Sequence, residues 1–237
     1  MPFLTAPRSA LLWAAAAAVL VSLAGFVLLD YEAHWDWESL AYRDFWTLEG
    51  FLRNTFFNGW HPVFPWVAFL FTGMWIGRLR LSAPRVQAGL AAGGLLVAAL
   101  GMLPAQTVQD PELAELAGTA PVPPGPFYIL SASGSAAAAI GLLLLVTPRL
   151  PGVLAGWLAA PGRQALTLYA AHILLGMGAL EAAGLLDGSL KNGEVLGLGA
   201  GFCALSMLYA KAWLKAARHG PLELLLRWPA RKRPRQG

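Results

Sequence analysis

The stretch NGWHPVFPWVAFLFTGMWIGRLR, residues 58–80, determines the class of fold. Its centre is apolar and uncharged, its front end holds an asparagine, a histidine and two prolines, and Arg78 and Arg80 close it. A helix needs about 20 residues to cross a hydrocarbon core of ~30 Å. Proline costs little in the first turn of a helix, because the first four N–H groups have no intrahelical partner there. The stretch therefore predicts a membrane span over about 59–78 that begins next to His61.

The composition extends this interpretation to the whole chain. Of the 237 residues, 57% are hydrophobic and only 13% are charged, against roughly 25% charged in soluble domains. We therefore expect an all-α fold, a polytopic membrane helix bundle. The one cysteine, Cys203, lies in an apolar run, which excludes an internal disulfide and a thiolate metal cluster. The sequence has no metal-ligand motif, P-loop or dinucleotide fingerprint, so we expect no metal and no bound cofactor.

Six apolar runs have the length of membrane spans. The first follows Arg8 and is longer than the apolar part of a signal peptide, and further runs follow it, so we interpret it as an uncleaved signal-anchor. The runs predict a single transmembrane domain over 1–228, followed by a basic cytoplasmic tail over 229–237. Asp110 and Pro111 can cap one short surface helix between the third and fourth spans. The expected spans are 11–29, 59–78, 86–103, 127–147, 164–185 and 195–214.

The distribution of charge predicts the orientation of the spans. If six spans alternate, 14 of the 17 Lys and Arg residues fall on one side, and 12 of the 13 Asp and Glu residues fall at or near the other, with Glu223 as the exception. Basic residues collect on the cytoplasmic side of membrane proteins, so both termini are expected in the cytoplasm. The basic tail suits contact with anionic lipid. We therefore expect the lipid bilayer, and no nucleic acid, as a partner.

The segment between the first two spans has the pattern of an amphipathic helix over about 37–56. Its apolar residues recur at spacings of three and four, while its charged residues take other faces. A helix of this kind lies in the membrane interface. It would either anchor the chain at the outer interface or cover an externally facing site, and the residues leave both open. The apolar positions are Trp37, Ala41, Phe45, Leu48, Leu52 and Phe56.

His61 stands at the expected N-terminus of the second span. The positive end of a helix dipole favours an anion or a developing oxyanion and disfavours an imidazolium, so a neutral imidazole here could act as a base or nucleophile. The structural alternative is that Asn58 and His61 only cap the helix, while Trp60 and Trp66 anchor it in the interface. The residues alone do not decide between these interpretations.

His172 is the second candidate. It lies nine residues after Arg163, or ~14 Å along a helix, which places it near the bilayer midplane. Polar groups at that depth face the bundle interior and often mark a pathway or a site. The structural alternative is a neutral histidine bonded to Thr167, to Tyr169 or to a neighbouring helix. His172 and Tyr169 are three residues apart and share a helix face.

Small residues indicate close helix packing. Gly73 and Gly77 form a GxxxG pattern, and further small residues recur in 131–139 and 197–202. Such stripes let helix backbones approach one another in a membrane. Gly73 and Gly77 are therefore expected to contact partner helices or a second copy of the chain.

Three stretches together resemble one family. FFNGWHPVFPWVAFLFTGMWIGRL, PGRQALTLYAAHILLG and RHGPLELLLR, in this order, look like the C-terminal half of YeiB-like bacterial membrane proteins, a family with a domain of unknown function. The resemblance covers about residues 45–228. The YeiB-like proteins are similar, more distantly, to transmembrane acyltransferases such as heparan-alpha-glucosaminide N-acetyltransferase.

The resemblance implies a membrane acyltransferase in the bacterial cytoplasmic (inner) membrane. Such an enzyme moves an acyl group from cytoplasmic acyl-CoA, its donor substrate, to a sugar or glycan acceptor on the far side, and a histidine is central to the transfer. Gly220, Pro221, Glu223 and Arg227 match the third stretch, without an assigned role. The implied catalytic residues are His61 and His172, and the implied substrate-binding residues are Asn58, Trp60, Trp66, Arg163 and Tyr169.

The chain departs from the family pattern at its start. Family members carry several more helices, including an early arginine-glycine motif, before the region that matches. The chain is accordingly interpreted as a half-length version, a gene fragment or a sequence whose start was placed too late. Two other functions remain open: a transporter or permease component, suggested by His172 at the midplane, and an accessory membrane protein that pairs with another helix bundle.

Overall fold

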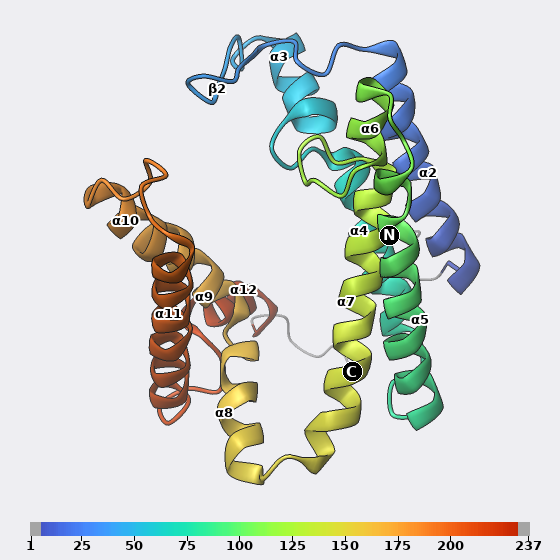
Figure 1. Cartoon of the computed structure of the whole chain (residues 1–237). Coiled ribbons are helices and arrows are strands. Elements are labelled where there is room, and N and C mark those ends of the chain that lie inside the picture. The colour runs from blue at the N-terminus through green and yellow to red at the C-terminus, as the bar shows by residue number, and fades with distance from the viewer. Residues whose placement is uncertain (1–5, 232–237) are drawn as a thin grey trace. The chain divides into compact units, whose positions relative to one another are not determined.

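The computed structural model describes residues 6–231 of the chain (Figure 1). The chain forms two compact units, Met1–Pro148 and Arg149–Gly237, called unit 1 and unit 2 below. Almost all regular structure in both units is helical, which confirms the all-α membrane bundle.

Unit 1 begins with a long helix and continues through a small hairpin and two short helical segments. It ends with three longer helices, and a 3-10 turn and a short helix lie before the last of them. In chain order its elements are α2 (Arg8–Leu28), β1 (Trp35–Asp36), β2 (Ala41–Tyr42), α3 (Leu48–Arg53), the π-helical turn η1 (Asn54–Asn58), α4 (Val63–Gly77), α5 (Pro84–Met102), the 3-10 turn η2 (Pro104–Gln106), α6 (Pro111–Ala117) and α7 (Pro126–Val146).

A 3-10 turn, η3 (Thr147–Arg149), leads into unit 2. Its elements are α8 (Gly152–Gly162), α9 (Ala165–Ala171), the π-helical segment η4 (His172–Met177), α10 (Gly178–Ala182), α11 (Asn192–Trp213) and α12 (Pro221–Arg231). The segments α9, η4 and α10 follow one another without a break in helical structure.

Within residues 6–231, five helical segments are long and apolar enough to cross a membrane, so the chain is a multi-pass membrane protein. They are Arg8–Leu28, Pro84–Gln106, Pro126–Arg149, Ala165–Ala182 and Asn192–Trp213. The remaining expected span, 59–78, which is the second in chain order, is shorter than predicted: α4 has 15 residues, or ~22 Å of helix. Helix α8, with 11 apolar residues, was not expected at all.

The prediction of an amphipathic helix over 37–56 is wrong for the first half of that segment. That part of the chain is a hairpin, in which Trp35 pairs with Tyr42, and Leu40 and Asp44 have the positive φ angles of 53° and 55° that a right-handed helix excludes. The helix begins at Leu48, because the Thr47 hydroxyl accepts a hydrogen bond from the N–H of Gly50 at 3.1 Å. The short surface helix expected after Asp110 is confirmed: it is α6, and the Asp110 carboxylate accepts from the N–H of Leu113 at 3.1 Å.

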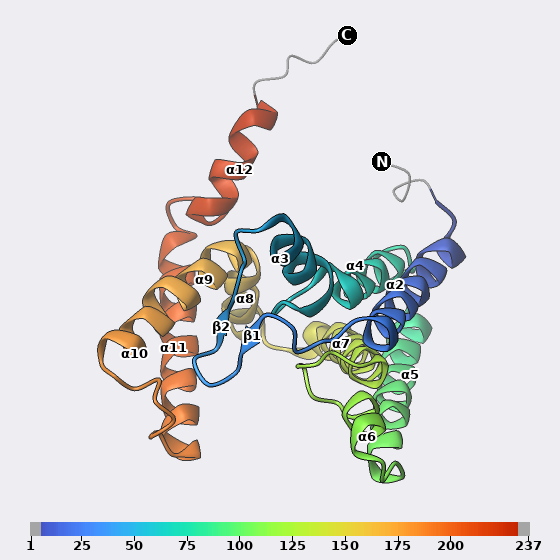
Figure 2. The same ribbon diagram turned by 90° about the horizontal axis from the view of Figure 1, so that it is seen from above.

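The long helices of unit 1 form two pairs, α2 with α4 and α5 with α7 (Figures 1 and 2). Helices α5 and α7 approach through facing glycines. A Cβ added at Gly134 would lie 2.5 Å from the backbone nitrogen of Ala98 and 2.7 Å from the carbonyl oxygen of Gly94. The packing predicted for the small residues of 131–139 is therefore confirmed, and the two pairs meet at Ala18, Ala68 and Ile129.

The other small-residue stripes have no such neighbours. A Cβ at Gly73 or Gly77, or at Gly197, Gly199 or Gly201, would meet nothing within 4 Å. Packing inside the described part of the chain therefore does not explain them. Any contact of Gly73 and Gly77 with a partner helix remains a proposal.

Candidate functional site

Asn58 holds together the polypeptide around the start of α4. Its side chain is fully buried. The amide Nδ2 donates to the carbonyl oxygens of Tyr31 at 2.8 Å and Ala33 at 2.9 Å, and Oδ1 accepts from the Tyr42 hydroxyl at 2.8 Å. The backbone carbonyl of Asn58 accepts from the indole N–H of Trp35 at 2.6 Å. Because three of the four bonding positions of this amide are used inside the protein, Asn58 positions the chain and its amide is committed to that task.

The turn around Gly59 is the second structural feature of this stretch. A Cβ at Gly59 would lie 2.9 Å from the Oδ1 atom of Asn54, with the carbonyl oxygen of Asn54 closer still, so only glycine fits. Pro62 and Pro65 are fully buried. The Trp60 ring contacts Trp35 edge-on, with 5.0 Å between ring centroids. Packing therefore accounts for each of these positions.

His61 differs from the buried residues Asn58, Pro62 and Pro65. It is exposed, and its ring contacts Trp66 edge-to-face, with 4.6 Å between ring centroids. Among the described residues its side chain makes none of the hydrogen bonds that fix Asn58. Helix α4 starts with Pro62 as its N-cap and without a side-chain cap, so the capping role considered for Asn58 and His61 is wrong. His61 thus carries an imidazole without a hydrogen bond among the described residues. It lies a few residues before the regular part of α4, which follows Phe64, whose angles (φ −104°, ψ 123°) are non-helical.

Trp66 adds a second chemical group beside His61. Its indole N–H is buried and has no hydrogen-bond partner among the described residues. The ring also packs against Phe69, with 5.6 Å between centroids, and against Tyr128 of α7 at 6.1 Å. A buried donor without a partner is costly in a folded protein. Trp66 therefore carries a buried, unused donor in a ring that contacts the ring of His61.

The charged groups of the hairpin are structural. The Arg43 guanidinium donates to the Asp36 carboxylate at 2.8 Å and holds the pKa of Asp36 below its ordinary value. The Arg43 side chain is 70% exposed and that of Asp36 is 29% exposed, so solvent screens the ion pair and it adds little stability. Burial raises the pKa of Tyr31 and of Tyr42, so Tyr42 keeps its phenolic proton and donates it to Asn58.

Unit 2 has its own polar junction, between α9 and α12. The Glu223 carboxylate accepts from the backbone N–H groups of Leu166 at 2.7 Å and Thr167 at 3.1 Å, and from the Thr167 hydroxyl at 2.5 Å. The Thr167 hydroxyl in turn accepts from the N–H of Leu222 at 3.1 Å. A carboxylate from α12 thereby caps the first turn of α9, where free N–H groups favour a negative charge.

Two further residues complete this junction. Gly220 is buried, and a Cβ there would lie 2.6 Å from the Thr167 hydroxyl oxygen. Gln164 is fully buried, and its Nε2 donates to the carbonyl oxygen of Ala210 in α11 at 2.9 Å, while its Oε1 has no partner among residues 6–231. Sequence patterns did not single out Gln164. The only signal in the sequence that could have pointed to Gln164 is a neutral amide beside Arg163 in an apolar run.

The candidate residues around His172 are exposed and do not form one cluster. Arg163 is exposed and follows the last residue of α8, and Tyr169 is 65% exposed. His172 is exposed at the start of η4, and its ring meets Phe202 of α11 edge-to-face, with 5.6 Å between centroids. Thr167, considered as a partner of His172, is bonded to Glu223 instead. His172 belongs to unit 2, whereas His61 belongs to unit 1.

Metal binding has no support in the part of the chain that the structure describes. No group of three His, Cys, Asp or Glu residues there could hold a metal ion. The chemistry available near His61 is that of an imidazole, an indole N–H and an uncapped helix N-terminus.

These features define an α-helical, multi-pass membrane protein. The chain belongs to the family described as "Protein of unknown function (DUF418)", the YeiB-like family, whose model matches residues 70–233. The match includes Arg163, Tyr169, His172 and Glu223 but begins after His61 and Trp66. No curated protein and no solved structure matches the chain.

Proposed function

We propose that this DUF418 protein is an acyltransferase-like membrane enzyme in which His61 acts on the transferred group. One observation carries the proposal. Buried bonds and packing account for Asn58, Gly59, Pro62 and Pro65, whereas His61, in the same short stretch, is exposed and makes no structural hydrogen bond among the described residues. A functional group held on a rigid frame but left unused by that frame is what a catalytic imidazole requires.

In this proposal the donor is acyl-CoA and the acceptor is a hydroxyl or amine of a sugar. The neutral imidazole of His61 takes the proton of the acceptor as the acceptor oxygen or nitrogen attacks the thioester carbonyl. The C–S bond then breaks, and the thiolate of coenzyme A receives the proton from the imidazolium. The N–H groups at the N-terminus of α4 supply donors for the negative charge on the carbonyl oxygen. The indole N–H of Trp66, buried and without a partner among the described residues, joins them when the acyl group binds against the ring.

The same proposal assigns an orientation. The basic residues of the chain favour cytoplasmic termini in a bacterial inner membrane, with His61 at the outer face. Asn58 then acts as a positioning residue, and Trp60 flanks the site on the hairpin side. Arg163, Tyr169 and His172 keep their proposed roles only if unit 2 contributes to the same reaction.

The test uses matched histidine variants of the full chain in proteoliposomes. Palmitoyl-CoA and acetyl-CoA serve as donors and a glucosamine-terminated oligosaccharide as acceptor, and release of the coenzyme A thiol is measured. His61→Asn should lower kcat about 100-fold or more, because a general base contributes roughly 10²- to 10⁴-fold. His34→Asn is the control, since His34 precedes the hairpin, outside the sequence stretch around His61, and its positive φ of 70° is one that asparagine tolerates.

Trp66→Phe provides a second measurement, because it keeps an aromatic ring against His61 but removes the N–H. It should lower kcat with little change in KM. Turnover that is unaffected by His61→Asn would refute the role of His61. Absence of thiol release from folded wild-type protein with both donors would refute acyl transfer from coenzyme A.

A second candidate function is pairing with other helices. Positions Gly73 and Gly77 face open space, and the span Ala165–Ala182 is apolar with none of its most apolar window buried. Open apolar and small-residue faces suit helix partners, which include a second copy of the chain. Native mass spectrometry of the detergent-solubilised protein tests this. Gly73→Ile should abolish any dimer, and a strictly monomeric wild type would argue against pairing.

A further inference from the structure

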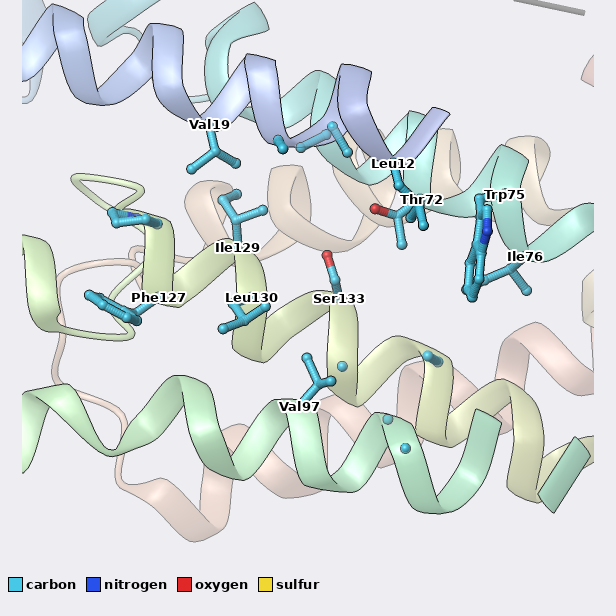
Figure 3. Close-up of a pocket in the computed structure, with 18 of the residues that line it drawn as sticks. Leu12, Val19, Thr72, Trp75, Ile76, Val97, Phe127, Ile129, Leu130 and Ser133 are labelled. Atoms are coloured by element: carbon cyan, nitrogen blue, oxygen red, sulfur yellow. The ribbon is translucent and has the colours of Figure 1, made fainter. Parts of the chain in front are cut away.

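Unit 1 contains a cavity of about 690 Å³ between its two helix pairs (Figure 3). Leu12, Val19 and Ile76 line it from α2 and α4, and Val97, Ile129 and Leu130 line it from α5 and α7. Apart from the hydroxyls of Thr72 and Ser133 and the indole of Trp75, its wall is apolar. Figure 3 shows the Ser133 side chain turned into the space between the pairs. The volume lies within the roughly 300–1,000 Å³ of typical ligand sites.

The packing of the two pairs explains why the cavity stays open. Each pair is tight within itself, and α5 and α7 are joined by backbone contacts at Gly94 and Gly134. Between the pairs, the buried contact is the small cluster of Ala18, Ala68 and Ile129. Two rigid pairs that touch mainly at one cluster leave a space along the rest of their length.

The cavity follows the helix axes. Its lining extends from Ala68 to Ile76 on α4 and from Phe127 to Ala137 on α7, which corresponds to ~12 Å and ~15 Å of helix. Because these helices are membrane-spanning or pack against membrane-spanning ones, the space runs in the direction in which lipid chains lie. Its length and apolar wall match a hydrocarbon chain, whereas a polar solute would find few partners there.

The wall of the cavity is continuous with the lipid-facing surface of the unit. Leu12, Leu20 and Leu130 line the cavity, and each is also exposed, by 43%, 63% and 43%. In a membrane protein such exposed leucines contact lipid. A chain can therefore enter from the bilayer without crossing a polar barrier.

We infer that this cavity binds one acyl chain of a membrane phospholipid. An apolar space of this size gains nothing from water, and when empty its walls forfeit their dispersion contacts. The surrounding bilayer supplies hydrocarbon chains at high concentration, and an inserted chain restores those contacts. The inference stands on the cavity and is independent of the reaction proposed for His61.

The experiment uses photolabelling in nanodiscs. The full chain is placed in bilayers of phosphatidylethanolamine and phosphatidylglycerol that contain a trace of phosphatidylethanolamine with a diazirine in the middle of one acyl chain. After irradiation, mass spectrometry locates the labelled residues. Label is expected on cavity-lining residues of all four helices, and excess unlabelled phospholipid should reduce it at these residues.

Two matched pairs of variants test whether the label reports the cavity. Ala137 lines it and Ala136 is exposed beside it, so Ala137→Phe should reduce labelling of α2 and α4 at least fivefold and Ala136→Phe should not. Gly93 lines the cavity with open space at its Cβ position, so Gly93→Leu fills it without a backbone clash. Ala92 is exposed beside it and does not line the cavity, so Ala92→Leu is the control. If Ala137→Phe fails to fold, the second pair of variants provides the test.

The outcomes distinguish a phospholipid chain in the cavity from surface labelling and from a donor site. Equal labelling in Gly93→Leu and Ala92→Leu would overturn the inference. Label found only on exposed residues that do not line the cavity would also overturn it. Displacement by palmitoyl-CoA, but not by excess phospholipid, would identify a donor site in place of a lipid site and so reject the phospholipid as occupant.

Discussion

Helices α5 and α7 in unit 1 and helices α9 and α12 in unit 2 are held together by different forces. The first pair meets backbone to backbone through Gly94, Gly134 and neighbouring alanines. In the second, Glu223 places a carboxylate on the N–H groups of Leu166 and Thr167. Close packing depends on the absence of side chains, whereas a polar junction depends on one side chain and its charge. The two regions should therefore respond to opposite kinds of substitution.

The largest effect is expected from filling the glycine contact. Gly134→Leu puts a side chain where a Cβ alone already lies 2.5 Å from the backbone of Ala98. Helices α5 and α7 must then separate, and the free energy of unfolding should fall by about 3 kcal/mol, at the upper end for overpacked sites. Reversible unfolding in detergent micelles measures it. Gly73→Leu should change the value by less than about 0.5 kcal/mol, and an equal loss in both variants would contradict close packing as the cause.

The next effect concerns the polar junction. Glu223→Ala leaves two backbone N–H groups and the Thr167 hydroxyl without their acceptor. The free energy of unfolding should fall by about 2 kcal/mol, the typical cost of hydrogen bonds to a charged group. Hydrogen exchange should increase at Leu166 and Thr167. Glu181→Ala, at an exposed carboxylate, is the control, and unchanged exchange in the Glu223 variant would mean that the carboxylate does not cap α9.

A smaller effect is expected from pH. Partial burial of the Glu223 carboxylate favours its neutral form, but the hydrogen bonds from Thr167 and Leu166 outweigh this, so the pKa of Glu223 lies below its ordinary value of 4.5. A lowered folded-state pKa stabilises the protein above the unfolded-state pKa, and this contribution is lost as the pH falls through the folded-state pKa. The stability difference between wild type and Glu223→Gln should therefore shrink as the pH is lowered below about 4.5. A difference that stays constant from pH 6 to pH 3 would exclude this linkage. The glycine contact of unit 1 should show no such dependence.

The smallest effect is expected at Gln164. Its Nε2 bonds to Ala210, but its buried Oε1 has no partner among the described residues. Gln164→Leu removes one good bond and one unsatisfied atom together, so the free energy of unfolding should change by less than about 1 kcal/mol. Thermal unfolding followed by circular dichroism is sufficient. A loss comparable to that of Glu223→Ala would show that unit 2 relies on Gln164 as much as on its carboxylate.

Much of the fold could be predicted from the apolar runs. The runs at 86–103 and 127–147 correspond to α5 and α7 within a few residues. The pattern over 37–56 predicted a helix that the structure confirms only from Leu48 onward, and Thr47, a typical N-cap residue, was the local signal for that start. Helix α8 was missed because its 11 residues are too few for a span.

The site was less predictable than the fold. The sequence singled out the stretch around His61, but it predicted that Asn58 binds substrate or caps a helix. Its amide is bonded to Tyr31 and Ala33, 27 and 25 residues away. Residues so distant in sequence give no periodic signal. Glu223 drew attention through a family resemblance and as the one acidic residue expected on the basic side, but only the structure gives it a partner, 56 residues away in Thr167.

The sequence by itself determined that the chain is a helical, multi-pass membrane protein. Bilayer insertion and helix formation depend on the length and hydrophobicity of contiguous segments, because every backbone hydrogen bond of such a segment closes within it. The tertiary structure alone decided which polar side chains are consumed by the fold and which remain free. That distinction, between buried Asn58 and exposed His61 three residues later, depends on contacts brought together from separate segments, and no local pattern contains it.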